Sequence, residues 1–153
     1  MSTDRARRPH MARQLLAGWR WFDDGLRAGL TEAGFGELTS TQSMVIPYLD
    51  PDGTRPVELA RRLGVTRQAV HQLVSGLVAQ GLIELVDDPT SSRSKLVRLT
   101  ERGEDSIEFA EATLAALEGE LTGTLGEHET LQLRRLLEAA WPAGGHRRAD
   151  PTA

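Results

Sequence analysis

Two short helical segments joined by a glycine-containing turn constrain the fold of this chain more than any other feature. The first begins at Pro56, a residue suited to the first position of a helix, and Gly64 stops it. Thr66 can cap the second, which continues to Gly81. Two helices joined by so short a turn are typical of a helix-turn-helix. The side chains expected to allow the helices to approach and to fill the angle between them are Ala60, Leu63, Val65 and Val70.

After the second helix the pattern changes from helical to strand periodicity. Residues 82–86 and 95–99 are short and rich in Leu, Val and Ile, and the sequence DDPTSSRS joins them as a Pro- and Ser-rich loop. This pattern predicts a β-hairpin. A hairpin directly after a helix-turn-helix predicts a winged helix-turn-helix over residues 55–100.

Amphipathic helices are predicted on both sides of this unit. In residues 9–33, six apolar side chains recur every three or four positions along one stripe. In residues 101–141, a heptad-like stripe begins after Thr100, and Gly123 and Gly126 separate it from a last helix.

A further helix is predicted before the helix-turn-helix. Thr39 can cap it, and Pro47 lies inside it, so we expect a kink there before the helix ends near Leu49. The sequence Asp-Pro-Asp-Gly at 50–53 then predicts a turn.

The outer helices carry more apolar surface than one small winged helix can cover. We therefore expect two chains to bury it together as a homodimer, although terminal helices folded back on their own domain remain an alternative. The expected fold is mostly α with a small β-hairpin. It consists of one winged helix-turn-helix domain over 9–141, dimerisation helices at 9–33 and 101–141, and disordered tails at 1–8 and 142–153.

Composition agrees with a protein of one domain. The chain has 153 residues and no cysteine, which excludes disulfides and thiolate chemistry. No apolar run approaches the roughly 18 residues of a membrane span, and no signal peptide is recognisable, so we expect a cytoplasmic protein. Residues 54–98 carry six Arg and one Lys against four acids, whereas 99–140 carry three Arg against ten acids. A basic middle in a chain of net charge −4 indicates a local site for a polyanion.

The second helix of the helix-turn-helix has a polar face that could read DNA. Gln pairs bidentately with adenine and Arg with guanine, while Ser, Thr and helix N-terminal amides suit phosphates. A polar face can also simply be solvated, but the turn spacing and the hairpin favour the DNA interpretation. The candidate DNA-binding residues are Thr66, Arg67, Gln68, His71, Gln72, Ser75, Arg93 and Lys95.

The run VELARRLGVTRQAVHQLVSGLVAQGLIELVDDPTSSRSKLVRLTERG resembles the MarR family of bacterial winged-helix transcriptional regulators, and LTSTQSMVIPYL resembles that family's second helix. The resemblance covers roughly residues 9–141. It implies a homodimer with recognition helices in successive major grooves, wings on the minor groove and a pseudo-palindromic operator. It also implies a repressor that a small-molecule effector releases from double-stranded DNA.

The chain departs from the family pattern in its wing and its recognition helix. The family's wing usually carries Asp-Arg where this chain has Ser91–Ser92, which leaves Arg93 as the wing-tip guanidinium without its usual brace. We therefore expect a mobile wing with Asp87 and Asp88 at its base, and modest affinity. The alternative is that Arg93 merely pairs with one of these two carboxylates. Gln72 and Gly76 stand where the family commonly has further basic residues, and Pro47 is unusual in its second helix.

The resemblance also suggests an effector pocket. The helices that border the family's ligand cavity carry several of this chain's few aromatic side chains, with arginines nearby. Apolar walls with one or two polar groups would suit a small aromatic or anionic molecule, although core packing is an alternative for each residue. The candidates are Arg13, Trp19, Arg20, Phe22, Met44 and Tyr48.

Other functions find little support in the sequence. Ser92 and Lys95 have the bare Ser-x-x-Lys spacing, but no Ser-Asp-Asn or Lys-Thr-Gly element accompanies them, so we expect no enzyme and no catalytic residue. The four histidines lack metal-ligand spacing and no phosphate-binding glycine loop is present, so we expect no metal and no cofactor. The remaining alternative is a winged helix used for protein interaction or dimerisation without specific DNA binding.

Overall fold

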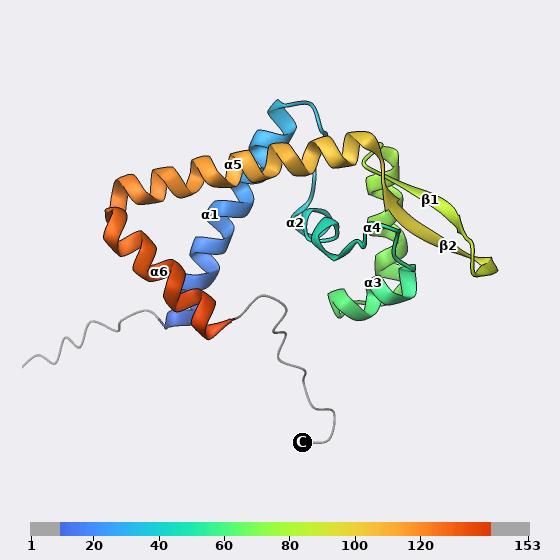
Figure 1. Ribbon diagram of the computed structural model, residues 1–153, viewed down its shortest axis with the longest axis horizontal. Coiled ribbons are helices and arrows are strands. Elements are labelled where there is room, and N and C mark those ends of the chain that lie inside the picture. The colour runs from blue at the N-terminus through green and yellow to red at the C-terminus, as the bar shows by residue number, and fades with distance from the viewer. Residues whose placement is uncertain (1–9, 142–153) are drawn as a thin grey trace, which may run out of the picture. The chain divides into compact units, whose positions relative to one another are not determined.

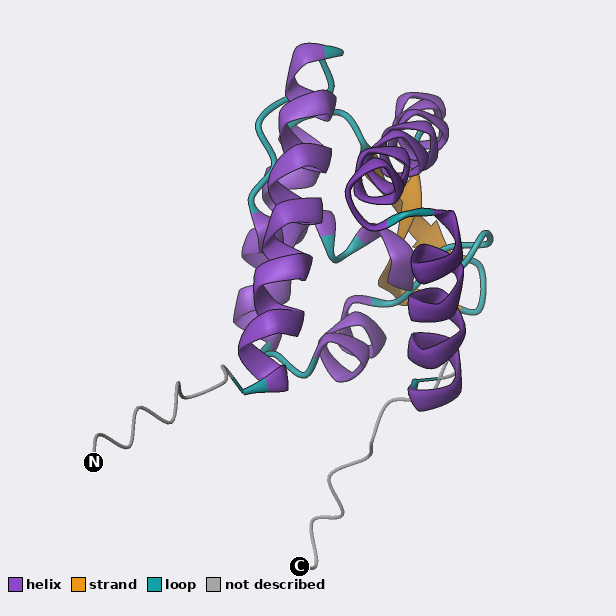
Figure 2. Ribbon diagram, turned by 90° about the vertical axis from the view of Figure 1, so that its left-hand side faces the viewer, coloured by secondary structure: helices purple, strands orange, loops and turns teal. Residues whose placement is uncertain are grey.

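Helices make up most of the part of the chain that the computed structural model describes, residues 10–141 (Figures 1 and 2). The predicted disordered tails lie outside these residues. In chain order the elements are α1 (Met11–Glu32), α2 (Ser40–Ser43), the 3-10 helix η1 (Ile46–Tyr48), α3 (Pro56–Leu63), α4 (Arg67–Ala79), β1 (Ile83–Asp88), β2 (Ser91–Leu99), α5 (Glu101–Leu125) and α6 (Glu127–Ala140). The chain divides into two compact units, one up to Leu114 and one from Ala115 on. None of the described helices is long and apolar enough to cross a membrane.

The helix-turn-helix forms as the sequence predicts. Pro56 occupies the first turn of α3, and Gly64 ends that helix in the left-handed conformation, at φ 67° and ψ 29°. The Thr66 side chain caps α4 by accepting the Ala69 N–H at 3.1 Å. Leu59 and Leu77 are fully buried where the two helices meet. This packing fixes the angle at which α4 leaves the turn.

The hairpin is longer than the sequence predicts. The two strands pair antiparallel from Ile83 opposite Leu99 to Asp88 opposite Ser91, so the connection is two residues long rather than the expected loop 87–94. The Ser-rich segment belongs to β2, although only Ser91 of residues 91–94 pairs with β1 and the next three residues bulge. Thr54 adds a short third bridge by pairing with Val97.

The helix predicted after Thr39 is shorter than expected. The capping box forms, because the Thr39 hydroxyl accepts the Gln42 N–H and the Gln42 side chain accepts the Thr39 N–H. The helix nevertheless ends at Ser43, and η1 follows. The expected kink at Pro47 is therefore a break. In a continuous helix its ring would clash with the carbonyl of Ser43, and its nitrogen has no proton to donate.

The break between the last two helices is at Gly126 alone, whereas both Gly123 and Gly126 were predicted to separate them. Gly123 lies inside α5, where its cost relative to Ala is only about 1 kcal/mol. Gly126, at φ 99°, is the residue that separates α5 from α6. In the second unit, Arg134 of α6 donates to Glu118 of α5, and none of the described residues of α6 is buried.

Gly103, in the first turn of α5, lies very close to the backbone of Leu82, the residue before β1. A methyl group on Gly103 would lie 2.0 Å from the carbonyl oxygen of Leu82. That oxygen also accepts the Thr100 N–H at 3.1 Å, so it is not free to move. Gly103→Ala should lower the free energy of unfolding by about 1–3 kcal/mol through this overlap.

The matched control is Gly119→Ala, also within α5, where a methyl group would have no neighbour within 4 Å. It should be neutral or raise stability by up to about 1 kcal/mol. Chemical denaturation of both variants measures the difference. Equal effects of the two substitutions would contradict the close approach.

Candidate nucleic-acid interface

Helix α4 presents one polar face to solvent. Val70, Val74 and Leu77 are buried on its inner side. The polar residues predicted to protrude are all exposed: Arg67, Gln68, His71, Gln72 and Ser75. Thr66, also exposed, stands at the N-terminus of the helix, where the first backbone amides lack intrahelical partners. The face therefore offers donors and acceptors suited to base edges, and an N-terminus suited to a phosphate.

Gly76 lies on another side of α4, against α2. A methyl group at this position would come within 2.2 Å of the Gln42 side-chain nitrogen. Gln42 is the residue that closes the capping box of α2. The absent side chain of Gly76 thus lets α2 lie against α4, and a larger basic residue there would displace Gln42.

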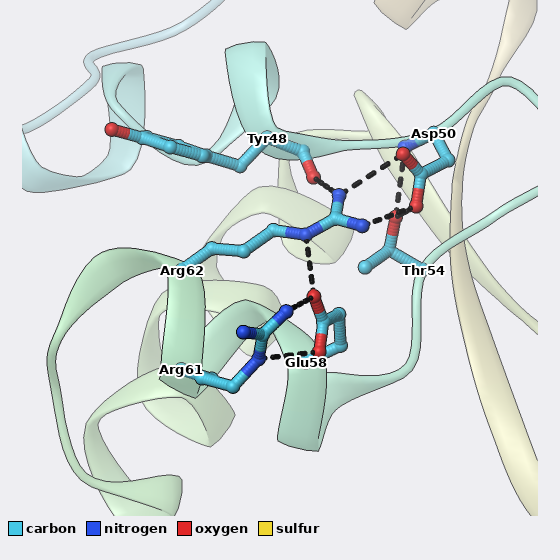
Figure 3. Close-up of polar contacts among 6 residues, drawn as sticks. All are labelled: Tyr48, Asp50, Thr54, Glu58, Arg61 and Arg62. Carbon is cyan, nitrogen blue, oxygen red and sulfur yellow. Dashed lines mark hydrogen bonds and ion pairs between the residues drawn. The ribbon is translucent and has the colours of Figure 1, made fainter. Parts of the chain in front are cut away.

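Arg62 of α3 ties three segments together (Figure 3). It donates to the Tyr48 carbonyl at 2.7 Å and to both carboxylate oxygens of Asp50 at 3.0 and 2.9 Å. Its Nε donates to Glu58 at 2.9 Å, and Glu58 also accepts from Arg61. A planar guanidinium with five donors can serve all these acceptors at once, which a lysine cannot.

These contacts lower the pKa values of the two carboxyl groups. Hydrogen bonds from Arg61 and then Arg62 lower the pKa of Glu58 from 4.5 to about 2. The hydrogen bond from Arg62 likewise lowers the pKa of Asp50. Both groups are therefore held ionised in the folded protein.

Thr54 carries this network into the sheet. It is 2% exposed, donates its hydroxyl proton to Asp50 at 3.1 Å and accepts the Asp50 N–H at 2.8 Å. Its backbone exchanges two hydrogen bonds of 2.9 Å with Val97 of β2. The helix-turn-helix and the wing are thus joined by a continuous chain of hydrogen bonds.

The wing carries Arg93 and Lys95, both exposed. Lys95 donates to Asp87 at 2.6 Å, and Asp88 accepts from Arg55 at 2.7 Å. The alternative that Arg93 pairs with Asp87 or Asp88 is therefore wrong, since both acids have other partners and Arg93 forms no ion pair within residues 10–141. The expected position of Asp88 at the base of a loop is also wrong, because Asp88 ends β1 at the hairpin tip and is buried.

Five residues that hold α3 and the wing in place were not predicted from the sequence. Glu58 and Arg62 have the i, i+4 spacing of a helical ion pair, so that contact had a signal in the sequence. The contact of Asp50 with Arg62 joins positions 12 apart and that of Arg55 with Asp88 joins positions 33 apart, and neither had such a signal. Asp50 and Thr54 are only four positions apart, and their contact was also not predicted.

The candidate effector residues are not gathered around a described hollow. Arg13, Trp19, Arg20 and Met44 are exposed, and Phe22 and Tyr48 are half-buried. The Phe22 ring packs edge-on against Trp21, 4.9 Å between centroids. A hollow of about 750 Å³ between α1 and the start of α2 contains none of the six; its lining includes Asp24, Arg27, Thr31, Glu37, Leu38 and Ser40.

Metal-binding side chains do not gather in the described part of the chain. No group of three or more His, Asp or Glu side chains is placed there to hold an ion.

Two helices joined at Gly64 and followed by an antiparallel hairpin define a winged helix-turn-helix protein. A family model described as MarR family matches residues 37–94. The protein Rv2011c of Mycobacterium tuberculosis is 50% identical over 79 residues, which is 50% of this chain and 48% of that protein. The chain spans about half the length of the curated relatives that it matches.

Solved structures extend the similarity over most of the chain. Wild-type MarR from E. coli, in its apo form, has a TM-score of 0.70 and 27% identity, covering 86% of this chain and 97% of that one. A point mutant of MepR from S. aureus, bound to an oligodeoxyribonucleotide, has a TM-score of 0.61 over 84% of this chain and 94% of that one; at 22% identity it supports the fold alone. Residues 37–94 thus resemble the MarR family, and the fold over most of the chain matches that of E. coli MarR. Members of this family are transcriptional regulators rather than enzymes.

The ion pairs of α3 predict how stability depends on pH. A carboxyl group whose pKa is lower in the folded state stabilises the fold above its unfolded value, and this contribution disappears as the pH falls through the folded value. For Glu58 the window runs from 4.5 down to about 2. Glu58→Gln should therefore lower the melting temperature at neutral pH and reduce the further loss between about pH 5 and pH 2.

The control is Glu111→Gln, which removes an exposed acid of α5 that forms no ion pair within residues 10–141. Its melting curve should follow that of the wild type at every pH. A Glu58→Gln protein with the same acid profile as this control would contradict the role assigned to the arginines.

Proposed function

We propose that this chain is a sequence-specific DNA-binding transcriptional regulator that acts as a homodimer on a pseudo-palindromic operator. The observation that carries the proposal is the exposed polar face of α4, together with a wing that bears Arg93 and Lys95. MepR, a relative in fold, has been solved with an oligodeoxyribonucleotide, which supports the proposal. In this proposal α4 enters the major groove and the wing lies along the minor groove.

The residues of α4 divide into base readers and phosphate binders. Gln68, His71 and Gln72 lie in the first two turns of the helix and are assigned to base edges. Arg67 is assigned to a phosphate or a guanine. Thr66 and Ser75 can donate hydroxyl protons to phosphates, and Arg93 and Lys95 contribute from the wing.

Exposed apolar side chains on the outer helices support the homodimer. Met11, Leu16, Trp19 and Trp21 of α1 are between 42% and 70% exposed. On α6 the exposed large apolar residues are Leu131, Leu133, Leu136 and Leu137. Apolar faces of this size need a cover, and a second copy of the chain supplies it with two-fold symmetry.

The sign of regulation and the effector follow the family pattern. We propose a repressor that a small aromatic or anionic molecule releases from the operator. Arg13, Trp19, Arg20, Phe22, Met44 and Tyr48 remain the proposed contacts of that molecule, since they lie on α1, at the end of α2 and on η1 and combine apolar surface with cationic groups.

A salt titration separates DNA binding from a protein-interaction role. Binding to duplex DNA should weaken linearly on a log–log scale, with a slope of about −0.9 for each phosphate that the protein neutralises. Arg67→Ala should make that slope less negative by roughly one for each phosphate contact that is lost. Arg135→Ala, which removes an exposed charge of α6, should leave it unchanged. Binding without salt dependence, or no binding at all, would favour the winged helix as a protein-interaction module.

Sequence preference is tested at Gln72. Gln72→Ala should relax the preference at one base position by about 1–3 kcal/mol if the amide pairs bidentately with adenine. The side chain is exposed, so the melting temperature should stay that of the wild type. Selection from randomised duplexes measures the preference, with Gln132→Ala of α6 as control. An unchanged selected sequence for Gln72→Ala would refute this assignment.

A further inference from the structure

The strand β2 bulges at the residue expected to reach DNA. Asp87 pairs with Lys95, but the next residue, Asp88, pairs with Ser91, so residues 92–94 have no partners on β1. Arg93 is the middle residue of this bulge and is exposed. Bulges of this kind re-aim a side chain away from the regular direction of the strand. The direction of Arg93 therefore depends on what fixes the two ends of the bulge.

The base end of the bulge is held weakly. Lys95 and Asp87 form an ion pair at 2.6 Å, but their side chains are 55% and 85% exposed. Solvent screens such a pair, which contributes about 0–1 kcal/mol.

The tip end is held by a buried carboxylate. The Asp88 side chain is 3% exposed and accepts the Thr90 N–H at 2.8 Å and the Thr90 hydroxyl proton at 2.6 Å. The Nε of Arg55 donates a hydrogen bond to the Asp88 carboxylate at 2.7 Å, and a terminal nitrogen of the same guanidinium donates one to the Thr90 hydroxyl at 2.9 Å. One guanidinium thus holds the last residue of β1, Asp88, and the second residue of the two-residue turn, Thr90.

Arg55 is itself fixed on both sides along the chain. It is the N-cap of α3, and Pro56 follows it in the first turn of that helix. Thr54 precedes it and is hydrogen-bonded to Val97 of β2. The guanidinium therefore connects the tip of the wing to the rigid start of α3.

We propose that Arg55 is a positioning residue for DNA binding: by holding Asp88 and Thr90 it fixes the tip of the wing and so aims Arg93 into the minor groove. A guanidinium in a narrow minor groove meets an enhanced negative potential, so its direction affects affinity. This proposal rests on the proposed DNA-binding function. Within the wing the Ser91 and Ser94 hydroxyls are hydrogen-bonded at 3.0 Å across the bulge, and Arg55 adds a charged brace from α3 that the Ser91–Ser92 sequence lacks.

Two neighbouring substitutions test the proposal because they predict opposite effects. Asp88→Asn leaves Arg55 charged but places an amide where the carboxylate was, so the tip should loosen and DNA affinity should fall about tenfold. Asp87→Asn also removes one negative charge from the wing, but it releases Lys95 and should raise affinity a few-fold. If Arg55 were only a phosphate contact, both substitutions would raise affinity. Equal or tighter binding by Asp88→Asn would therefore overturn the proposal.

A second pair of variants covers the case in which Asp88→Asn unfolds. Arg55→Lys keeps the positive charge but cannot hold both Asp88 and Thr90, so binding should weaken about tenfold while the melting curve stays cooperative. In this background Arg93→Ala should cost much less affinity than it does in the wild type, as a double-mutant cycle would show. Independent effects of the two substitutions would contradict a positioning role.

Hydrogen exchange without DNA separates this proposal from the one on which it rests. Amides 90–94 should exchange faster in Arg55→Lys than in the wild type, because the tip is no longer held. If the wild type binds no duplex DNA, the proposed function fails and the positioning role with it, whatever the exchange shows. If the wild type binds DNA and the exchange rates are equal, only the positioning role fails.

Discussion

The interaction on which this structure most depends is the set of hydrogen bonds around Arg62. One guanidinium joins α3 to the Tyr48 carbonyl and to Asp50, and Asp50 continues through Thr54 to β2. The acceptors Tyr48 and Asp50 lie 14 and 12 residues before Arg62, so no local helical preference would bring them to this guanidinium. Charge-assisted hydrogen bonds of this kind are stronger than neutral ones, and the bidentate contact with Asp50 also fixes orientation.

The functional geometry follows from this arrangement. With α3 fixed to the sheet, the left-handed turn at Gly64 determines where α4 begins, and the buried Val70, Val74 and Leu77 determine which face it presents. Arg55, at the other end of α3, reaches the wing tip. The short helix α3 thus connects α4 and the wing, the two parts proposed to bind DNA, although no base contact is proposed for α3 itself.

The elements that were predicted correctly are those with local causes. Thr39 and Thr66 begin helices because their hydroxyls accept nearby backbone protons, and Gly64 ends one because glycine adopts a positive φ readily. The exposed face of α4 also follows from its helical period. Predictions went wrong where a residue's type allows two outcomes: Gly123 stays in its helix, and the Ser-rich segment after Asp88 forms a strand rather than a loop. The contact between Arg55 and Asp88 could not be predicted, because it joins residues 33 positions apart and needs the folded sheet to bring them together.

The central claim is that two copies of this winged helix read DNA in a two-fold arrangement. Selection of bound sequences from random duplex DNA by the purified protein tests it most directly. The account predicts an enriched pseudo-palindrome whose half-site centres lie about one helical turn apart, roughly 10–10.5 base pairs. Enrichment of no sequence, or of a single element without an inverted partner at that spacing, would contradict it.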